Sequence, residues 1–200
     1  MKLTNSFLLT ALTWAAALNG LISPQTALSA DDPAEVQIPA VVSGGHATDP
    51  RDHGRPVILV ASALGVTPEV FRHAFSRVKP APAGEQPDPA QVQLNKQALL
   101  DTLEPYGITN DRLDEVSNFY RYNGRNGDLW HHTHATVKAT LRNGVVTSFT
   151  IVNPGAGYTT APAITVPGQP SVKVIATLSF GPDLARNGSL QAVKLVEGQP

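Results

Sequence analysis

The chain has 200 residues with 15 lysines and arginines against 16 aspartates and glutamates, so its formal net charge is −1, and it has no cysteine. This length allows one larger core or two small ones, and the near-zero charge gives no electrostatic attraction to nucleic acid or anionic lipid. The lack of cysteine excludes disulfide bonds, thiol chemistry and the zinc sites that depend on thiolates.

Residues 1–30 have the features of a secretory signal peptide. Lys2 precedes an apolar stretch over residues 7–17, and small residues occupy most of 27–30. The unbroken apolar run is shorter than the roughly 20 residues that a membrane-spanning helix needs. We therefore expect cleavage near Asp31, a secreted or periplasmic protein, and no stable membrane span after cleavage. An uncleaved N-terminal anchor is the alternative, because apolar residues continue beyond the main run.

Residues 31–54 are predicted to form an extended leader. Its short apolar runs, Val36–Ile38 and Val41–Val42, could add an edge strand to a sheet, but no turn signal fixes their position. We interpret the leader as a tether that can become ordered when it docks.

Apolar residues at helical spacing predict four helices within a helical domain over residues 55–122. The first helix ends at Gly65, and the others begin at the capping residues Thr67, Asp88 and Thr109. Because Leu64–Thr67 and Tyr106–Thr109 are similar turns, we expect two helical hairpins packed together. The expected inward-facing residues are Val57, Val60, Ala61, Leu64, Val70, Phe71, Ala74, Phe75, Val78, Val92, Leu99, Leu103, Leu113, Val116 and Tyr120.

The apolar period changes to two after residue 130, which predicts a β domain over residues 130–200. A hairpin unit is repeated there: Val137–Leu141 leads to an Arg-Asn-Gly at 142–144, and Ala176–Leu178 leads to an Arg-Asn-Gly at 186–188. The predicted fold class is α+β, with an N-terminal pair of helical hairpins followed by a small, mostly antiparallel β-sheet of about five strands.

An Asn-Gly turn, an alternating strand, the Gly-x-Gly-Tyr loop Gly155–Tyr158 and a second strand over Pro162–Val166 follow one another. Residues 144–168 thereby resemble a β-repeat of bacterial surface and phage tail proteins, although the second copy of the hairpin lacks the Gly-x-Gly-Tyr loop. The resemblance implies display or adhesion architecture. The order of motifs along the mature chain, including Leu64–Thr67 and Asn110–Asn118, is also similar to a group of uncharacterised secreted bacterial proteins, which implies architecture alone.

Three histidines within four residues, His131, His132 and His134, form the strongest candidate for a metal-binding cluster in the sequence. Imidazoles can bind zinc, copper or nickel without thiolates. At strand spacing His132 and His134 would share a face, and Asp128 could complete a mixed nitrogen and oxygen site. The simpler interpretation is a set of exposed histidines at the entrance to the sheet.

A second polar cluster precedes the first helix. It could bind a divalent ion or position a water molecule, but the interleaved arginines favour salt bridges, and the aspartates are also turn and helix-entry residues. Its members are His46, Asp49, Arg51, Asp52, His53 and Arg55.

Aromatic residues gather where the helices should meet the sheet. Tyr122, Trp130 and Tyr158 are the predicted ligand-binding residues, because aromatic faces flanked by arginine and asparagine suit sugars or peptides. The alternative is that these rings seal the junction between the two halves. The ring of Tyr158 can also fold over the glycines of its own loop, which requires no ligand.

We find no hydrolase, metalloprotease or phosphate-loop motif in the sequence. The leading hypothesis is an exported, non-catalytic scaffold or binding module that requires no cofactor, does not bind nucleic acid, and contacts a polysaccharide or an envelope protein. The alternative is a metal-assisted hydrolase that uses the cluster His131–His134.

Overall fold

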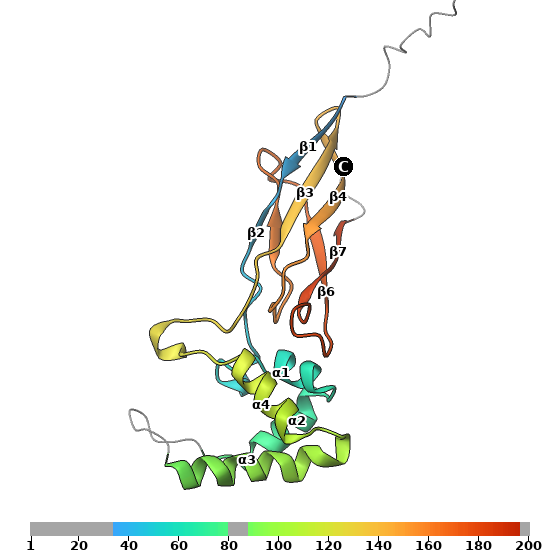
Figure 1. The fold of residues 1–200 in the computed structure, drawn as a ribbon. Helices are drawn as coiled ribbons and strands as arrows, with labels where there is room; N and C mark the ends of the chain where they lie inside the picture. Colours follow the sequence, from blue (N-terminus) through green and yellow to red (C-terminus); the bar gives the residue numbers. More distant parts are fainter. Residues whose placement is uncertain (1–33, 80–87, 197–200) are drawn as a thin grey trace, which may run out of the picture. The chain divides into compact units, whose positions relative to one another are not determined.

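The structure is a computed structural model that describes residues 34–79 and 88–196. The predicted signal peptide at 1–30 lies outside the described residues. The fold is mixed α+β, as expected (Figure 1). The elements in chain order are β1 (Glu35–Pro39), β2 (Val41–Ser43), the 3₁₀ helix η1 (Pro50–Asp52), α1 (Val57–Leu64), α2 (Pro68–Phe75), α3 (Pro89–Leu103), η2 (Glu104–Tyr106), α4 (Asn110–Phe119), η3 (Gly124–Asn126), β3 (Thr136–Arg142), β4 (Val145–Asn153), β5 (Ala163–Thr165), β6 (Val174–Ser179) and β7 (Ser189–Leu195).

The helix ends follow the capping signals. Gly65 ends α1 with a φ of 74°, a backbone conformation that glycine adopts without strain. The side chains of Thr67, Asp88 and Thr109 each accept a hydrogen bond from a backbone amide in the first turn of α2, α3 and α4, at 3.3, 3.0 and 3.2 Å. The four predicted helices are therefore confirmed.

The arrangement of the helices differs from the two predicted hairpins. The chain turns by 104° between α1 and α2. Helix α2 packs on both α1 and α3, whereas α4 packs on α1. The turn over Leu64–Thr67 ends one helix and caps the next within a few residues, so it sets a corner and not an antiparallel return.

Within residues 34–79 and 88–196, no single helix has the length and apolar character to cross a membrane, and only the bent pair α1 and α2 passes that test jointly.

The helical core contains most of the expected residues. Leu103 and Val116 are fully buried as expected, Leu59 is fully buried although it was not among the expected residues, and Trp130 joins them from beyond the last helix. The expectation for Val92 is wrong, since 44% of this residue is exposed. Val92 lies in the first turn of α3, whose buried residues, Leu100 and Leu103, are at its other end.

All five predicted strands are present as β3 to β7, but the leader adds β1 and β2, and the seven strands of the described residues form three sheets in place of one. Their orders are β1-β3-β4, β2-β5 and β6-β7, and every pairing is antiparallel. The leader from residue 35 is therefore part of the β-structure and not a tether. Strand β1 hydrogen-bonds to the edge of β3 that the β3-β4 hairpin leaves unpaired, which satisfies those backbone groups.

The repeated sequence unit forms equivalent hairpins. In the β3-β4 hairpin the pairing register shifts between Thr140 and Leu141, and in the β6-β7 hairpin it shifts between Thr177 and Leu178, at the same Ala-Thr-Leu step. The connections differ. Asn143 and Gly144 make a two-residue turn between β3 and β4, whereas β6 and β7 are joined by the longer segment 180–188.

Asn187, in the second copy, connects the β-structure to the helices. Asn187 is 1% exposed. The side-chain amide donates to the carbonyl of Leu59 in α1 at 2.8 Å and to the hydroxyl of Tyr120 after α4 at 2.9 Å. Its side-chain oxygen accepts from the Ser62 hydroxyl at 2.8 Å and from the Gly181 amide at 3.2 Å.

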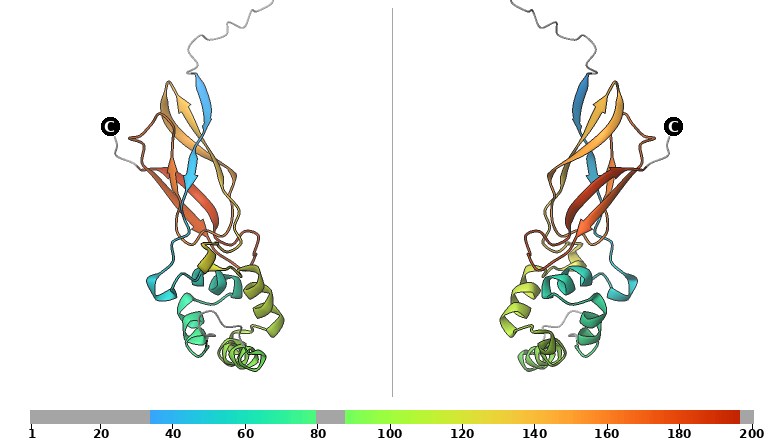
Figure 2. Two further views of the ribbon diagram at one scale, coloured as in Figure 1. Left: turned by 90° about the vertical axis from the view of Figure 1, so that its left-hand side faces the viewer. Right: turned by 90° about the vertical axis from the view of Figure 1, so that its right-hand side faces the viewer.

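All described elements belong to one structural unit, and both views in Figure 2 show the helices at one end of the strands.

We predict that Asn187→Asp lowers the free energy of unfolding by at least about 2 kcal/mol, because a carboxylate oxygen would replace the amide donor and face the Leu59 carbonyl without solvent. Urea denaturation followed by fluorescence measures the change.

The matched control is Asn143→Asp in the first copy. Asn143 is exposed with a φ of 51°, which aspartate tolerates, so we expect a change within about 0.5 kcal/mol. Equal effects of the two substitutions would contradict the role assigned to Asn187.

Candidate functional site

An open cleft of about 450 Å³ lies where the segment before α1 meets α2 and the loop after Tyr158. We call it the Arg72 cleft. None of its lining residues lies in a strand. They are Ala47, Thr48, Asp49, Arg51, Asp52, Arg55, Pro56, Val57, Ile58, Pro68, Glu69, Arg72, Thr159 and Thr160.

Asp49 has both a structural and an electrostatic role in this cleft. Its carboxylate accepts from the backbone amide of Arg51 at 2.9 Å, which caps η1, and from the Arg51 guanidinium at 2.6 Å. The hydrogen bond from the Arg51 side chain, followed by that from its backbone, holds the pKa of Asp49 well below its usual range. Asp49 is therefore a carboxylate, and its orientation is fixed by its own loop.

Arg72 of α2 connects three carboxylates. Its Nε and Nη2 atoms donate to the two oxygens of Asp52 at 2.7 and 2.9 Å, a bidentate pair in which the Asp52 side chain is only 4% exposed. Its Nη1 donates to Glu69 at 3.0 Å, and its Nη2 lies 3.5 Å from Asp49. The hydrogen bond with Asp52 is the main reason that the pKa of Arg72 is raised.

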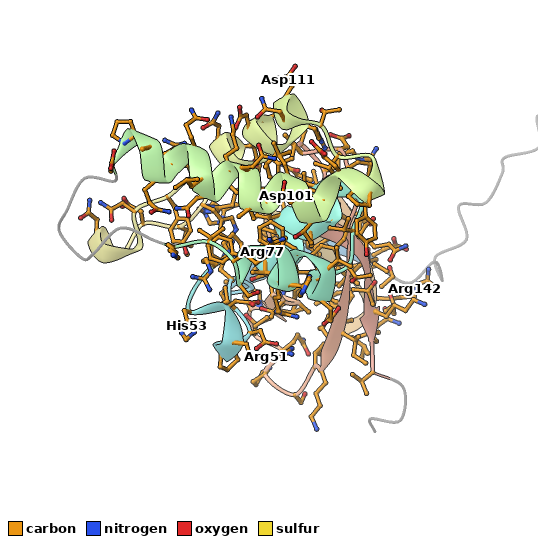
Figure 3. All side chains as sticks on the ribbon, turned by 90° about the horizontal axis from the view of Figure 1, so that it is seen from below. Arg51, His53, Arg77, Asp101, Asp111 and Arg142 are labelled. Atoms are coloured by element: carbon orange, nitrogen blue, oxygen red, sulfur yellow. The ribbon has the colours of Figure 1, made fainter. Side chains whose placement is uncertain are left out.

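A smaller hollow of about 190 Å³ adjoins the cleft and shares Arg51, Asp52, Arg55, Val57 and Arg72 with it. Figure 3 labels Arg51 and His53, whose exposed side chains lie near each other on the segment that precedes α1. The two hollows therefore meet at one set of charged residues.

The interpretation of this polar cluster as salt bridges and turn residues is confirmed for Asp49 and Asp52. Sequence reasoning missed the partner of Asp52, because Arg72 is 20 residues away on another helix. The fixed ion pairs present hydrogen-bond donors and acceptors side by side at the surface of an open cleft. Such a surface can bind a polar ligand without reorganising.

We predict that Arg72→Met lowers the free energy of unfolding by about 2 kcal/mol, because it leaves the buried carboxylate of Asp52 unpaired. We expect less than the cost for a fully enclosed pair, since the Arg72 side chain is 22% exposed. Thermal or urea unfolding measures the loss.

Arg51→Met is the control, since Arg51 is 66% exposed and its partner Asp49 remains reachable by water. Its stability should be nearly that of the unsubstituted protein. A loss as large as that of the Arg72 variant would contradict the structural role of the buried pair.

Two of the three predicted ligand-binding aromatics are inside the protein. Trp130 and Tyr158 are each 2% exposed. The indole Nε1 of Trp130 donates to the Gly157 carbonyl at 2.8 Å, and the Tyr158 hydroxyl accepts from the Ala135 amide at 2.9 Å. Their polar atoms are thus already satisfied, and the prediction that these two rings form an open binding surface is corrected: they seal the junction between helices and strands.

Close packing explains the glycines of the Gly155–Tyr158 loop. A Cβ atom at Gly157 would lie 2.7 Å from the His131 carbonyl oxygen, and one at Gly155 would lie 2.6 Å from that of Thr133. The same loop donates backbone hydrogen bonds from Gly157 and Tyr158 to the carbonyls of Asn187 and Gly188, at 2.8 and 3.0 Å. The loop therefore joins the two hairpins and has no room for a ligand.

Tyr122 is the predicted aromatic residue that remains partly accessible. Its side chain is half-buried, and its hydroxyl donates to the Gly54 carbonyl at 2.7 Å. Burial raises the pKa of Tyr122, and the positive charge of Arg55 partly offsets this effect. Tyr122 therefore lies beside the residues that lead into the Arg72 cleft.

Of the predicted metal ligands, His132 and His134 lie close together, with ring centroids 5.1 Å apart, but Asp128 does not join them. Within residues 34–79 and 88–196, no three carboxylate or histidine side chains are placed to hold a metal ion. The Nδ1 of His132 donates to the Trp130 carbonyl at 2.9 Å, which directs this ring toward His46, at a centroid distance of 4.8 Å. Asp128 lies instead on the exposed stretch before Trp130.

His46 completes a group of rings with Trp130, His132 and Tyr158. Its ring stacks on Tyr158 at 5.1 Å and meets Trp130 edge-on at 6.0 Å. Its Nε2 is buried, with no hydrogen-bond partner among the described residues. Burial, then the nearby His132 and His134, lower the pKa of His46. The folded structure therefore favours its neutral form.

We predict that the protein loses stability as the pH falls below 6.5, the ordinary pKa of histidine. Below that pH the unfolded chain binds a proton that folded His46 resists, so protonation favours unfolding; above it both forms are neutral and this contribution is constant. His46→Phe, which keeps a stacking ring, should reduce the slope of stability against pH between about pH 6.5 and 5.

His73→Gln on the exposed face of α2 is the control and should leave the slope unchanged. Urea midpoints measured across the pH series decide the matter. An unchanged slope for the His46 variant would show that other groups carry the pH dependence.

Comparison with known proteins found no match to the chain among family models, curated proteins or solved structures.

Proposed function

We propose that the protein is an exported, non-catalytic binding module that contacts a polymer of the cell surface through the Arg72 cleft. Export rests on the sequence of residues 1–30. The observation that carries the binding proposal is the cleft itself, an open hollow of about 450 Å³ whose charged groups hold one another in place.

The geometry of the cleft suits a ligand rich in hydroxyl groups. Asp49 and Glu69 offer carboxylate oxygens, Arg51 and Arg72 offer N–H groups, and the exposed Thr160 adds a hydroxyl. Neighbouring hydroxyls on a sugar ring both donate and accept, so they can bond to such paired groups. Because the ion pairs exist before binding, little side-chain entropy is lost when a ligand arrives.

The same contacts favour binding over acid–base catalysis. A general acid needs a carboxyl group that keeps its proton near neutral pH. Arg51 holds the pKa of Asp49 low, and Arg72 makes a bidentate pair with Asp52. The alternative hydrolase has less support, since the described residues do not gather Asp128, His132 and His134 around one point.

The proposal predicts that filling the cleft abolishes binding without unfolding the protein. Thr160→Trp places an indole in the cleft from an exposed position. We expect its retention on isolated cell envelopes, or on polysaccharides extracted from them, to fall at least about tenfold, the loss of roughly 1.4 kcal/mol of binding. Co-sedimentation measures the bound fraction.

Thr150→Trp is the matched control, because Thr150 is exposed on β4, which contributes no residue to the cleft. It should bind like the unsubstituted protein. Envelopes digested with protease distinguish a polymer from an envelope protein: retention that disappears after digestion would make a protein the partner. Failure to bind any envelope or polysaccharide would reject the proposal.

A further inference from the structure

Arg55 differs from the other arginines of the Arg72 cleft. Within residues 34–79 and 88–196, Arg51 and Arg72 each pair with carboxylates, but no carboxylate lies within ion-pair distance of Arg55. The guanidinium carbon of Arg55 lies 4.5 Å from the centre of the Phe75 ring. Its Nε is buried without a hydrogen-bond partner, and the residue lines both the cleft and the adjoining hollow.

An unpaired guanidinium in this position is suited to an anion. Burying its Nε without an acceptor costs free energy, which a hydrogen bond donated to an oxygen of the ligand can recover. The planar guanidinium matches the two oxygens of a carboxylate. Its aromatic neighbour, Phe75, stabilises the cation without occupying its N–H groups.

The N-terminus of α1 also favours the binding of an anion in the cleft. Val57, the first residue of α1, follows closely after Arg55, and the helix has neither a side-chain cap nor an acidic residue in its first turn. The positive end of its dipole is therefore uncompensated on its own helix, and both Val57 and Ile58 line the cleft. This is a secondary contribution beside the charge of Arg55.

We propose that the ligand of the Arg72 cleft is an acidic polysaccharide, whose sugar carboxylate binds Arg55 while its hydroxyls bond to the ion-paired rim. This inference rests on the proposed function and adds the chemical class of the ligand. The predicted ligand-binding residue Tyr122 bonds to Gly54, the residue before Arg55, but lines neither hollow and has no part in this inference.

A peptide carboxylate fits this site less well. Extended peptides commonly bind by adding a strand to a sheet edge, and no lining residue of the cleft belongs to a strand. A hollow of about 450 Å³ instead accommodates a short, compact ligand such as one or two sugar rings. The ion pairs along its rim supply the donors and acceptors that hydroxyls need.

The test uses polygalacturonate, alginate and hyaluronate, each in native form and after chemical reduction of its carboxylates to alcohols. We expect at least one native polymer to bind, and its reduced form to bind at least about tenfold more weakly. Arg55→Gln should reproduce that loss on the native polymer, and Arg55→Lys should recover part of it, because lysine keeps the charge but not the planar N–H pair.

Arg77→Gln is the matched control, since Arg77 is exposed near the end of α2 and lines neither hollow (Figure 3). Thermal melts of every variant exclude unfolding as the cause. Equal binding of native and reduced polymers, or full binding by the Arg55→Gln protein, would overturn the inference while the proposed function stands.

Tri-alanine, which has a free C-terminal carboxylate, tests whether the carboxylate that binds Arg55 comes from a peptide and not from a sugar. Its binding in an Arg55-dependent manner, with no binding of the acidic polymers, would also overturn the assignment to a sugar. Failure of the whole protein to bind any envelope polymer, acidic or neutral, is the separate result that rejects the proposed function.

Discussion

The hydrogen bonds of Asn187 are the interaction on which the arrangement of the protein depends. A buried amide with two donors and one acceptor oxygen can satisfy groups on several elements at once. Here it bonds to α1 twice, through Leu59 and Ser62, and to Tyr120 after α4. The helices and the second hairpin are therefore held in one relative position. The Arg72 cleft has no lining residue in that hairpin, but its residues Thr159 and Thr160 follow Tyr158, whose amide donates to the Gly188 carbonyl of the hairpin at 3.0 Å.

The cleft and the sealed aromatic group are two results of the same junction. Trp130 and Tyr158 fill the interior of the junction, with Trp130 in the helical core and Tyr158 in the core of the strands. The Thr159 hydroxyl, next along the chain, donates to the Ala47 carbonyl at 2.7 Å and so holds the leader against the loop. Of the acidic residues of the leader, Asp49 then remains partly exposed and Asp52 is buried, and Arg72 lies within ion-pair distance of both. Because the rings are buried, charged side chains and not aromatic faces line the open cleft.

Local signals in the sequence were enough to predict the helices and most strands, but they were not enough to predict how these elements assemble. Thr67, Asp88 and Thr109 cap helices because a side chain and an amide a few residues away decide that contact. The strands β1 and β2 were not recognised as fixed, since their partners, β3 and β5, are distant in sequence. The pairing of Asp52 with Arg72 and the burial of Trp130 have the same cause. The sequence indicated the polar cluster and the aromatic junction, but which of them is open to a ligand is decided by tertiary packing.

The Arg-Asn-Gly triplets of the two hairpin copies also differ in how readily they change chemically over time. An asparagine followed by glycine loses its side-chain amide readily, because the next backbone nitrogen can attack the side-chain carbonyl without hindrance from a bulky residue. Asn143 is exposed in a two-residue turn, so this deamidation can proceed there and adds a negative charge far from the junction. At Asn187 the bonded amide and the crowded backbone of Gly188 oppose the required rotation. Of the two hairpin copies, deamidation would therefore alter Asn143 and spare Asn187, which joins the helices to the strands; Asn126, exposed and followed by Gly127, is open to the same reaction.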